Sequence, residues 1–501
     1  MHNSFDAIVI GSGLGGLVAG ALAAKSGARV VVLERHDQVG GAATNFTRGK
    51  LRIDAGLHQM DGFEADDPNR ALFEHLGLFD HITLVPLPEL YAVHHPAFGR
   101  FVMPSLADQH RGQVEAHFPS HSRAIHHWFD EILGKSAPQE PSSDPHRWSM
   151  AHYERSSISP WLEALFGEQE GIKLALCANL PYYGDDPDRL SLKFFATAQG
   201  SFYRGNYYIK GGSGQLSQAL ARIIRTHGGE VRCGQVVNRI LIKKGRVTGV
   251  TCASRNGTSA CEVSAPMVFA NAAPMVTAEM LPPQERRLFR ANYAGLEPAT
   301  SLWCIYLGVK TQPQNYGLIH HSTFLFPDWM HTLGHYREAA GLLAESPQNI
   351  IPPYVVANYA AIDSGLATNG MNLIVLTGLD RLANWDILDK RAYAQKKKAW
   401  MKALIQDFSS RFPGIESKIV VSEMATARTM ARYLNTPGGS VYGFAQTPMQ
   451  AGRHRPGAKT PVPGLWLASA FSRPGGGFTG TMLAGHMAFS MAFRATNASG
   501  T

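Results

Sequence analysis

The sequence predicts an α/β protein in which a domain built on βαβ units is interleaved with a second, mixed α+β domain. Residues 5–33 read as strand, glycine-rich turn, helix and strand, which is the length of one βαβ unit. Residues 465–493 repeat the order strand, glycine-rich loop and helix near the other end of the chain. With 501 residues, 45% of them apolar, the chain is long enough for two domains.

The first elements follow from local composition. Phe5–Ile10 is a short apolar run and predicts a buried strand. Leu17–Lys25 is rich in alanine and leucine and predicts a helix, which Ser26–Ala28 ends. Arg29–Leu33 is β-branched and predicts the second strand.

The middle of the chain is less regular. Residues 71–135 are predicted to be mainly helical, and residues 136–150, rich in proline and serine, to form a surface loop. Residues 230–270 are predicted to form short strands, with a turn at Lys244–Arg246. In residues 300–425 the apolar residues follow no single period, which predicts a mixture of strands and helices. One further helix is predicted from an apolar face that carries Leu216, Leu220, Ile223 and Ile224.

Charge excludes some classes of partner. The net charge of +8 is spread thinly over 47 basic and 39 acidic residues, and no nucleic-acid-binding motif accompanies it. The densest run, Lys396–Lys398, lies among apolar residues at helical spacing and predicts the solvated face of an amphipathic helix, with peripheral membrane contact as the alternative. No apolar run reaches the roughly 18 residues of a spanning helix.

Cysteine and histidine spacing predicts no metal site. The five cysteines match neither a metal motif nor a disulfide framework, and with no recognisable secretory leader they favour the cytoplasm. His117 and His121, like His331 and His335, have i, i+4 spacing, but neither pair has a nearby glutamate in the zinc-peptidase pattern. The sequence does not specify an oligomeric state.

The glycine-rich turn carries the first chemical signal. Gly11, Gly13 and Gly16 follow the first strand and open the helix, and Glu34 ends the next strand. Gly11 permits a tight turn, Gly13 a close approach to a pyrophosphate, and Gly16 close packing of helix on strand. The helix N-terminus offers N–H groups to phosphates, and Glu34 can accept hydrogen bonds from ribose hydroxyls while repelling a 2′-phosphate. The pattern predicts a dinucleotide site that disfavours NADP.

A second set of motifs distinguishes FAD from NAD. The pair Gly40–Gly41 and the stretch Asp54–His58 follow Glu34 closely, which suits a long, two-ended cofactor. This order resembles flavoproteins of the amine oxidase and phytoene desaturase superfamily, in which the glycine pair lines the FAD pyrophosphate and the second stretch lies near the isoalloxazine. Ala42 stands where that family often has a basic residue, so one phosphate contact is absent.

The resemblance covers nearly the whole chain. Residues 204–250 are similar to the second part of the FAD domain in phytoene desaturases, carotenoid isomerases and retinol saturases, and Val237 matches a backbone contact to adenine. Arg432–Tyr433 and the Pro474–Gly477 loop resemble the same group. The resemblance implies a Rossmann-like FAD-binding domain interleaved with an α+β substrate domain. We expect the FAD-binding domain to comprise residues 1–70, 205–290 and 425–501, and the substrate domain residues 71–204 and 291–424.

The C-terminal glycine loop is predicted to meet the flavin. A helix that begins near Phe478 would direct its positive end at the flavin ring and stabilise its reduced form. Gly475, Gly477 and Gly480 also fit the dinucleotide pattern formally, so a second nucleotide site is the alternative. Together these motifs predict an FAD site formed by Gly11, Ser12, Gly13, Gly15, Gly16, Glu34, Arg35, Gly40, Gly41, Ala42, Gly56, Leu57, His58, Val237, Ala470, Gly477, Phe478, Thr479 and Met482.

Catalytic side chains are less clearly marked. No nucleophile–histidine–acid signature occurs, so the chemistry is expected to belong to the flavin, which gives or takes a hydride at N5. His58 lies in the stretch that should meet the flavin, and Arg432 and Tyr433 flank family motifs; these three are the candidate catalytic residues. Several aromatic side chains are either plain core, which is the favoured interpretation, or part of the pocket wall: Phe202, Tyr203, Tyr207, Tyr208, Trp303, Tyr306, Phe324 and Phe326.

The resemblance leaves four functions open. The first is an FAD enzyme that desaturates, saturates or isomerises C=C bonds of a long, conjugated, apolar polyene, as in carotenoid biosynthesis. The second is a reductase or cyclase of a polyketide polyene in secondary metabolism, such as a polycyclic tetramate macrolactam precursor, because residues 56–62 differ from typical carotenoid desaturases. An amine oxidase is third. A prenyl- or lipid-binding escort protein without redox activity is the fourth.

Overall fold

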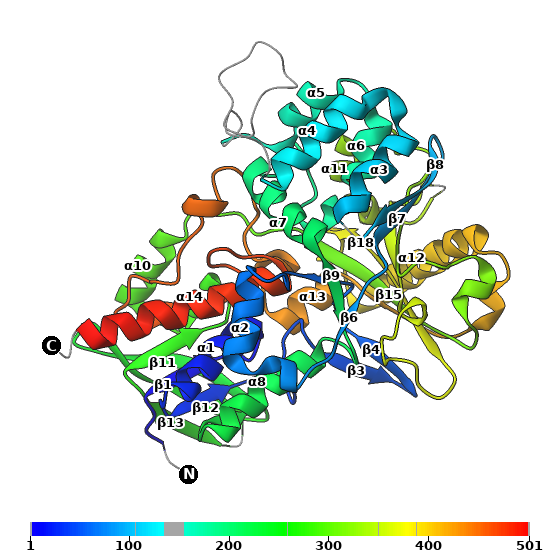
Figure 1. Cartoon of the computed structure of the whole chain (residues 1–501). Coiled ribbons are helices and arrows are strands. Elements are labelled where there is room, and N and C mark those ends of the chain that lie inside the picture. Colours follow the sequence, from blue (N-terminus) through cyan, green and yellow to red (C-terminus); the bar gives the residue numbers. More distant parts are fainter. Residues whose placement is uncertain are drawn as a thin grey trace, which may run out of the picture.

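The computed structural model describes residues 3–105, 107–134, 155–257, 259–348, 350–386 and 388–498. Its first layer is a five-stranded parallel sheet (Figure 1). The strand order is β10-β2-β1-β14-β20, from Glu230–Arg232, Val30–Leu33, Ala7–Ile10, Met267–Ala270 and Leu465–Leu467. Strands from both ends of the chain thus meet in one sheet, and the predicted α/β class is confirmed. The predicted loop at residues 136–150 lies outside the described residues.

Helix α1 (Leu14–Lys25) connects β1 to β2, as the sequence predicts. Its residues from Leu14 to Ala24 are all buried, because the helix lies between the sheet, α8 (Gly214–Thr226) and α14 (Gly477–Ala498). A helix enclosed on all sides must be apolar on all sides, which explains its alanine- and glycine-rich sequence. The predicted apolar face of α8, from Leu216 to Ile224, is buried against it.

The second layer is a seven-stranded mixed sheet on the right of Figure 1. Its order is β19-β15-β18-β17-β16-β7-β8, from Ile419–Ala425, Ser301–Val309, Asn372–Asp380, Tyr354–Asn358, Ser322–Leu325, Glu89–His95 and Gly99–Pro104. A three-stranded sheet, β5-β9-β6, joins the two layers and comprises Met60–Asp61, Asn206–Ile209 and Leu84–Pro86.

The prediction that residues 71–135 are mainly helical is wrong for residues 84–104. Only α2 (Pro68–Leu76), α3 (Ala107–His117) and α4 (Ser122–Ile132) are α-helices there, and β6, β7 and β8 lie between them. β7 is buried along nearly its whole length in the sheet, so it lacks the polar–apolar alternation that marks a half-exposed strand. Of its two partners, β8 follows it in a hairpin, with His95 opposite Gly99, and β16 is distant in sequence, with Thr323 opposite Ala92.

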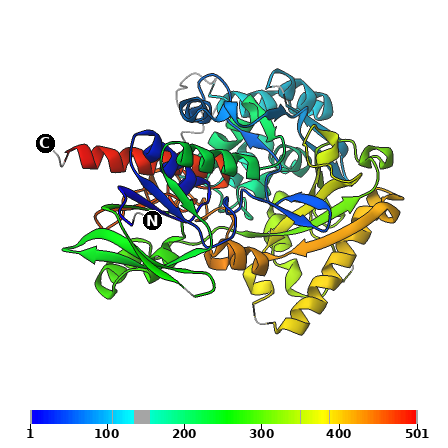
Figure 2. The ribbon, with the colours of Figure 1, turned by 90° about the horizontal axis from the view of Figure 1, so that it is seen from below.

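A helical layer lies above the seven-stranded sheet in Figure 1. It contains α3 and α4 together with α5 (Ile158–Phe166), α6 (Glu170–Leu176), α7 (Leu192–Arg204) and α11 (Tyr336–Ala339). Trp128 and Trp161 stack at the centre of this layer, with ring centroids 4.9 Å apart. In the view from below, the two sheets lie toward opposite ends of the molecule (Figure 2).

Helix α12 (Lys390–Arg411) carries the lysine run and packs Trp400, Leu404 and Phe408 into the core, as an amphipathic helix should. Lys396 is not a free surface charge, because its Nζ donates to the backbone oxygen of Asn384 at 2.8 Å. Within the described residues, no helix combines the length and the apolar character that crossing a bilayer requires.

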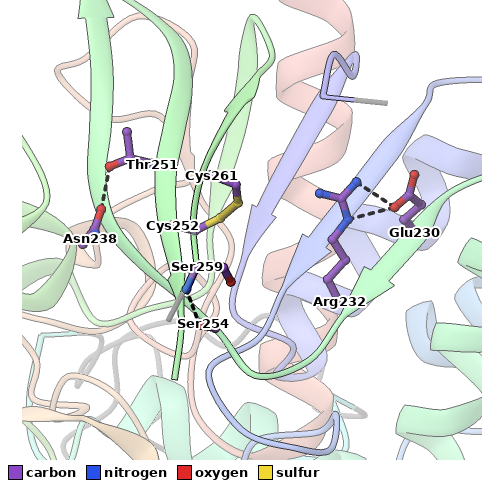
Figure 3. The surroundings of a disulfide bond; sticks show 8 residues. All are labelled: Glu230, Arg232, Asn238, Thr251, Cys252, Ser254, Ser259 and Cys261. Carbon is purple, nitrogen blue, oxygen red and sulfur yellow. Dashed lines mark hydrogen bonds and ion pairs between the residues drawn. A yellow bond between two sulfur atoms is a disulfide. The ribbon is translucent and has the colours of Figure 1, made fainter. Parts of the chain in front are cut away.

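The expectation of no disulfide is wrong, because Cys252 and Cys261 are bonded (Figure 3). They lie directly opposite each other on β12 (Arg246–Ser254) and β13 (Ala260–Ser264), with Cα atoms 5.4 Å apart. β12 also pairs with β11 (Gln235–Lys243), which places Val237 opposite Cys252. The register of a hairpin, rather than a cysteine motif, brings the two thiols together.

The disulfide predicts a thiol count. When protein purified without reductant is denatured in an alkylating reagent, the reagent should label three cysteines, Cys177, Cys233 and Cys304. After reduction of the disulfide it should label all five. Intact-mass analysis of the alkylated chain measures this, with Cys252→Ser as the control. Five labelled cysteines before reduction would contradict the pairing.

Candidate FAD site

The Gly11–Gly16 loop packs too tightly for side chains. A Cβ atom on Gly13 would lie 2.4 Å from Oδ1 of Asn271, and one on Gly16 would lie 2.6 Å from the Gly11 oxygen. Asn271 also accepts a hydrogen bond from Gly13 N at 2.9 Å and donates to the Ala468 oxygen at 2.6 Å. Sequence reasoning missed Asn271, whose only signal is its position just after β14. Gly13 caps α1 without a side-chain hydrogen bond, so the first N–H groups of the helix can bind phosphate.

Glu34 lies at the end of β2 and is buried. One carboxylate oxygen accepts hydrogen bonds from Ser12 N at 2.7 Å and Ser12 Oγ at 2.6 Å, and the other accepts from His36 N at 2.8 Å. The carboxylate thus ties the glycine loop to the second strand at the place where a dinucleotide ribose is expected. The strand of Val237 begins beside it, because Gln235 N donates to the Glu34 backbone oxygen at 2.7 Å. Val237 itself is half-buried.

Glu34→Ala should lower the affinity for FAD about 10- to 100-fold, because a charged acceptor worth roughly 1.5–3 kcal/mol is lost. Titrating apoprotein with FAD and following flavin fluorescence measures the change. Glu168→Ala removes an exposed carboxylate and serves as the matched control. Equal affinities of Glu34→Ala and Glu168→Ala would place the ribose elsewhere.

Gly40 and Gly41 lie against the first glycine loop. Gly40 N donates to the Ser12 oxygen at 2.9 Å, and a Cβ atom on Gly41 would be 3.4 Å from the Cα of Gly13. Both residues have positive φ, 124° and 58°, a conformation that favours glycine. Gly56 approaches the same segment, since its Cβ would be 3.5 Å from the Ala42 oxygen. The structure therefore brings the predicted glycine pair to the phosphate loop.

The helix α14 begins at Gly477, whose φ is 56° and whose Cβ would meet no atom within 4 Å. Its first turns lie beside the N-terminus of α1: a Cβ atom on Gly15 would be 2.5 Å from the Ala468 oxygen and 3.0 Å from the Thr481 oxygen. Met482 is fully buried, and Phe478 packs on the same core from its edge. The N-termini of α1 and α14, which carry the positive ends of the helix dipoles, thus lie near each other. This arrangement suits one cofactor whose pyrophosphate binds at α1 and whose flavin ring lies at α14.

His58 is buried among uncharged polar groups. Its Nδ1 is 3.1 Å from the hydroxyl of Tyr182, its Nε2 is 3.4 Å from Thr377 Oγ1, and its backbone oxygen accepts from His321 Nε2 at 2.7 Å. Burial, with a smaller contribution from His321, lowers the pKa of His58 to about 3. His58 is therefore neutral at physiological pH. The neighbouring Leu57 is also buried, and its oxygen accepts from Tyr359 at 2.6 Å.

Arg432 and Tyr433 lie on α13 (Ala427–Leu434), and their described contacts are with the Glu34 end of the site rather than with His58. The Arg432 oxygen accepts from Arg35 at 3.2 Å, and the Tyr433 oxygen is 2.8 Å from His36 Nε2. The Tyr433 ring stacks on His36 and is 52% exposed. These contacts give neither residue a place beside the predicted flavin ring.

Asp61 is a site residue that sequence reasoning missed. Its carboxyl group is buried at the C-terminal end of β5, where Oδ1 accepts from the hydroxyl of Thr479 at 2.6 Å. The side chain of Ser201 on α7 hydrogen-bonds to the same carboxyl, and burial raises its pKa. Asp61 therefore connects the first turn of α14 to the helical layer. Its signal in the sequence was its place three residues after His58.

The Gln59 side chain, between these two residues, is also buried, and neither atom of its amide has a hydrogen-bond partner among the described residues. Buried amides are usually paired, so Gln59 has hydrogen-bonding capacity for a ligand. Over the same part of the chain, no group of three or more His, Cys, Asp or Glu side chains is arranged to hold a metal ion.

The glycine loops, the uncapped end of α1 and the acceptor Glu34 fit a dinucleotide, and the open start of α14 fits its second end. Comparison with known proteins gives the family. The family model of flavin containing amine oxidoreductases matches residues 14–488, so the chain belongs to that family. It is an FAD-dependent oxidoreductase.

Relatives of known activity align over most of the chain at low identity. An all-trans-retinol 13,14-reductase of Danio rerio is 24% identical over 87% of this chain and 77% of its own. A chloroplastic prolycopene isomerase of Daucus carota is 26% identical over 97% and 80%, and the neurosporene-forming phytoene desaturase of Rhodobacter capsulatus is 27% identical over 97% and 93%.

Solved structures share the fold. An oxidoreductase from Methanosarcina mazei superposes with a TM-score of 0.61 at 17% identity, covering 98% of this chain and all of that one. A RAB GDI from Plasmodium falciparum superposes with a TM-score of 0.55 at 9% identity, covering 99% of both chains. The predicted α/β fold is thus shared with these solved structures, and the fold alone does not separate enzymes from other proteins.

Proposed function

We propose that this protein desaturates, saturates or isomerises C=C bonds of a long, conjugated, apolar polyene. The observation that carries the proposal is the uncharged, aromatic setting of His58. Its partner Tyr182 packs on Phe324, and Phe324 and Phe326 line the wall beside Thr377. The described contacts of His58 include no carboxylate that could pair with an ammonium group, and the aromatic rings beside it can pack against a conjugated hydrocarbon. The names of the three relatives agree with this substrate class.

Bound FAD would accept or donate a hydride at its N5 atom. The residues of the chain would bind and orient the two reactants. Glu34 and the glycine loops would hold the adenosine diphosphate, and the start of α14 would face the flavin ring. His58 and Tyr182 would present neutral hydrogen-bonding groups, because burial raises the pKa of Tyr182 as it lowers that of His58.

We also propose the predicted division of labour between segments. Residues 1–70, 205–290 and 425–501 supply all strands of the five-stranded sheet, which supports their assignment to FAD binding. Residues 71–204 and 291–424 supply the helical layer and nearly all of the seven-stranded sheet, which supports substrate binding. An apolar small molecule as partner is part of the proposal. Location in the cytoplasm stays a prediction, and the Cys252–Cys261 disulfide counts against it, because disulfides persist mainly in oxidising compartments.

Asp61 and Gln59 favour a second candidate, a reductase or cyclase of a polyketide polyene such as a tetramate macrolactam precursor. Saturation or reductive ring closure requires a proton as well as a hydride, and a buried carboxyl group with a raised pKa can carry that proton. A tetramate ring would also satisfy the unpaired Gln59 amide. Saturation of a plain hydrocarbon would also use the Asp61 proton, but it would leave the Gln59 amide unpaired.

A prenyl- or lipid-binding escort protein, the non-enzymatic alternative, would have the same fold but would not need a cofactor. The close packing at Gly13 and Gly16 and the hydrogen bonds of Glu34 support FAD binding and argue against it. Purification discriminates: the proposal expects a yellow protein that releases FAD on denaturation, and a colourless protein that cannot be loaded with FAD would favour an escort.

Anaerobic incubation of a polyene panel with the FAD-loaded protein, once with the flavin oxidised and once with the flavin chemically reduced, followed by mass analysis, tests the function. Loss of two hydrogens identifies a desaturase, gain of two a reductase, and an unchanged mass with altered absorbance an isomerase. The panel should pair carotenoids with a polyene macrolactam. Conversion of the macrolactam beside unreacted carotenoids would select the second candidate, and no conversion of any polyene by FAD-loaded protein would reject both.

A further inference from the structure

Arg455 is the only arginine that is buried among the described residues, with 1% of its surface exposed. Its guanidinium donates to backbone oxygens: Nη1 to Phe444 at 3.0 Å, and Nη2 to Ala470 at 2.6 Å and to Tyr442 at 3.4 Å. Its Nε has no partner among the described residues. The side chain therefore ties its own segment to two others, the one at Tyr442 and Phe444 and the one at Ala470, and it retains one unused donor.

No described carboxylate pairs with this guanidinium, and burial alone lowers its pKa, to about 9. The buried Lys173 offers a contrast, because it forms ion pairs with Glu163 at 2.8 Å and Glu170 at 2.7 Å. An unpaired buried charge is costly, and carbonyl dipoles offset only part of that cost. At neutral pH Arg455 keeps its charge, so its site is suited to a negative charge that arrives from outside the chain.

Arg455 lies directly against the loop that leads into α14. A Cβ atom on Gly475 would be 2.1 Å from Arg455 Nε and 2.3 Å from Nη2, so the guanidinium packs on bare backbone. Gly475 in turn lies on the first turn of the helix, since a Cβ atom on Gly480 would be 2.4 Å from the Gly475 oxygen. Ala470, whose oxygen accepts from Arg455, belongs to the predicted FAD site. One layer of backbone separates the charge from the start of α14.

We propose that Arg455 is a positioning residue whose fixed positive charge stabilises the negative charge that the flavin ring gains on reduction, acting through the Gly475–Gly477 loop. The inference rests on the part of the proposed function that places the flavin at the start of α14. It is independent of the substrate. A charge held close to the ring in a buried site acts strongly, because little water screens it.

The midpoint potential of the bound FAD, measured without any polyene, tests the inference. Arg455→Gln keeps a donor for the carbonyls but removes the charge, and Arg455→Lys keeps the charge but loses the planar fork. In Arg455→Gln the ratio of reduced to oxidised flavin at a fixed potential should fall at least about tenfold, which is about 30 mV for a two-electron couple. Arg455→Lys should stay closer to the wild type. Arg290→Gln, which removes an exposed guanidinium paired with Glu279, is the matched control and should change nothing.

The affinity of the oxidised holoprotein for sulfite is a second reading, because the adduct at flavin N5 is negatively charged and bleaches the flavin. Sulfite should bind to the wild type, to Arg455→Lys and to Arg290→Gln, and at least about tenfold more weakly to Arg455→Gln. If Arg455→Gln does not fold, the wild type still decides: failure of its flavin to bind sulfite overturns the inference. Equal midpoint potentials of the bound FAD in the wild type and in Arg455→Gln would also overturn the inference, and the role of Arg455 would then be structural alone. Inactivity toward polyenes with these shifts intact would reject the substrate class alone.

Discussion

Gly13→Val should purify without FAD and bind added FAD at least about 100-fold more weakly than the wild type, a loss of about 2.8 kcal/mol. A Cβ atom at this position would lie 2.4 Å from Asn271 Oδ1, so either the loop or Asn271 must move. Asn271 fixes the loop through Gly13 N and ties it to Ala468, and a shift would therefore disturb the whole phosphate-binding end. The two branches of valine would also occupy the approach to the pyrophosphate.

Flavin content per chain and the dissociation constant of the reconstituted protein measure this effect. Gly49→Asn is the matched control, because Gly49 has φ of 58° with no atom near its Cβ, and asparagine tolerates that conformation. The control should retain full flavin content and the thermal stability of the wild type. A yellow Gly13→Val protein with normal FAD affinity would contradict the placement of the pyrophosphate at α1.

Asp61→Asn should lower the rate of polyene reduction by about 10²- to 10⁴-fold, the usual contribution of a general acid. Asparagine fills the same space and still accepts a hydrogen bond from Thr479, so FAD content and thermal stability should remain those of the wild type. Single-turnover mixing of reduced enzyme with polyene measures the rate without interference from turnover. Asp66→Asn, at an exposed position, is the control and should react normally.

The pH dependence follows from the raised pKa of Asp61. The protonated form of Asp61 is present below that pKa, so the rate of polyene reduction should be highest at low pH and fall as the pH rises through the pKa. The pH–rate profile of Asp61→Asn should not show this fall. The same shift acts on stability: a carboxyl whose folded pKa exceeds its unfolded pKa stabilises the fold below the unfolded value, and this contribution is lost as pH rises. Equal pH profiles of wild type and Asp61→Asn would remove Asp61 from the proton path.

The cofactor half of the molecule was predictable because its signals are local. The turn at Gly11–Gly16, the helix after it and Glu34 lie within one short segment, and each has a steric or electrostatic reason that sequence alone conveys. The lysine run on α12 was likewise predictable, because helical periodicity separates its buried face from its charged one.

The rest depends on contacts between distant segments. β7 was missed because it is buried along nearly its whole length and so lacks polar–apolar alternation, and its neighbour β16 lies more than 200 residues away. Cys252 and Cys261 are only nine residues apart, but their pairing depends on the register of the β12–β13 pair. Asp61 became a site residue because Thr479, far along the chain, donates to it. The resemblance that marked Arg432 and Tyr433 concerned a motif, and their backbone carbonyls contact Arg35 and His36 instead of the region of His58.

Anaerobic mixing of the FAD-loaded enzyme with polyenes and with primary amines, followed by flavin and polyene absorbance together, tests the central claim most directly. A desaturase reduces one oxidised flavin for each polyene converted, and a reductase oxidises one reduced flavin, so both redox forms of the enzyme are mixed with each substrate. An isomerase changes the polyene spectrum with no net change in the flavin. Primary amines should leave the oxidised flavin unchanged. Bleaching of the flavin by an amine, with every polyene unaltered, would contradict the account and identify an amine oxidase.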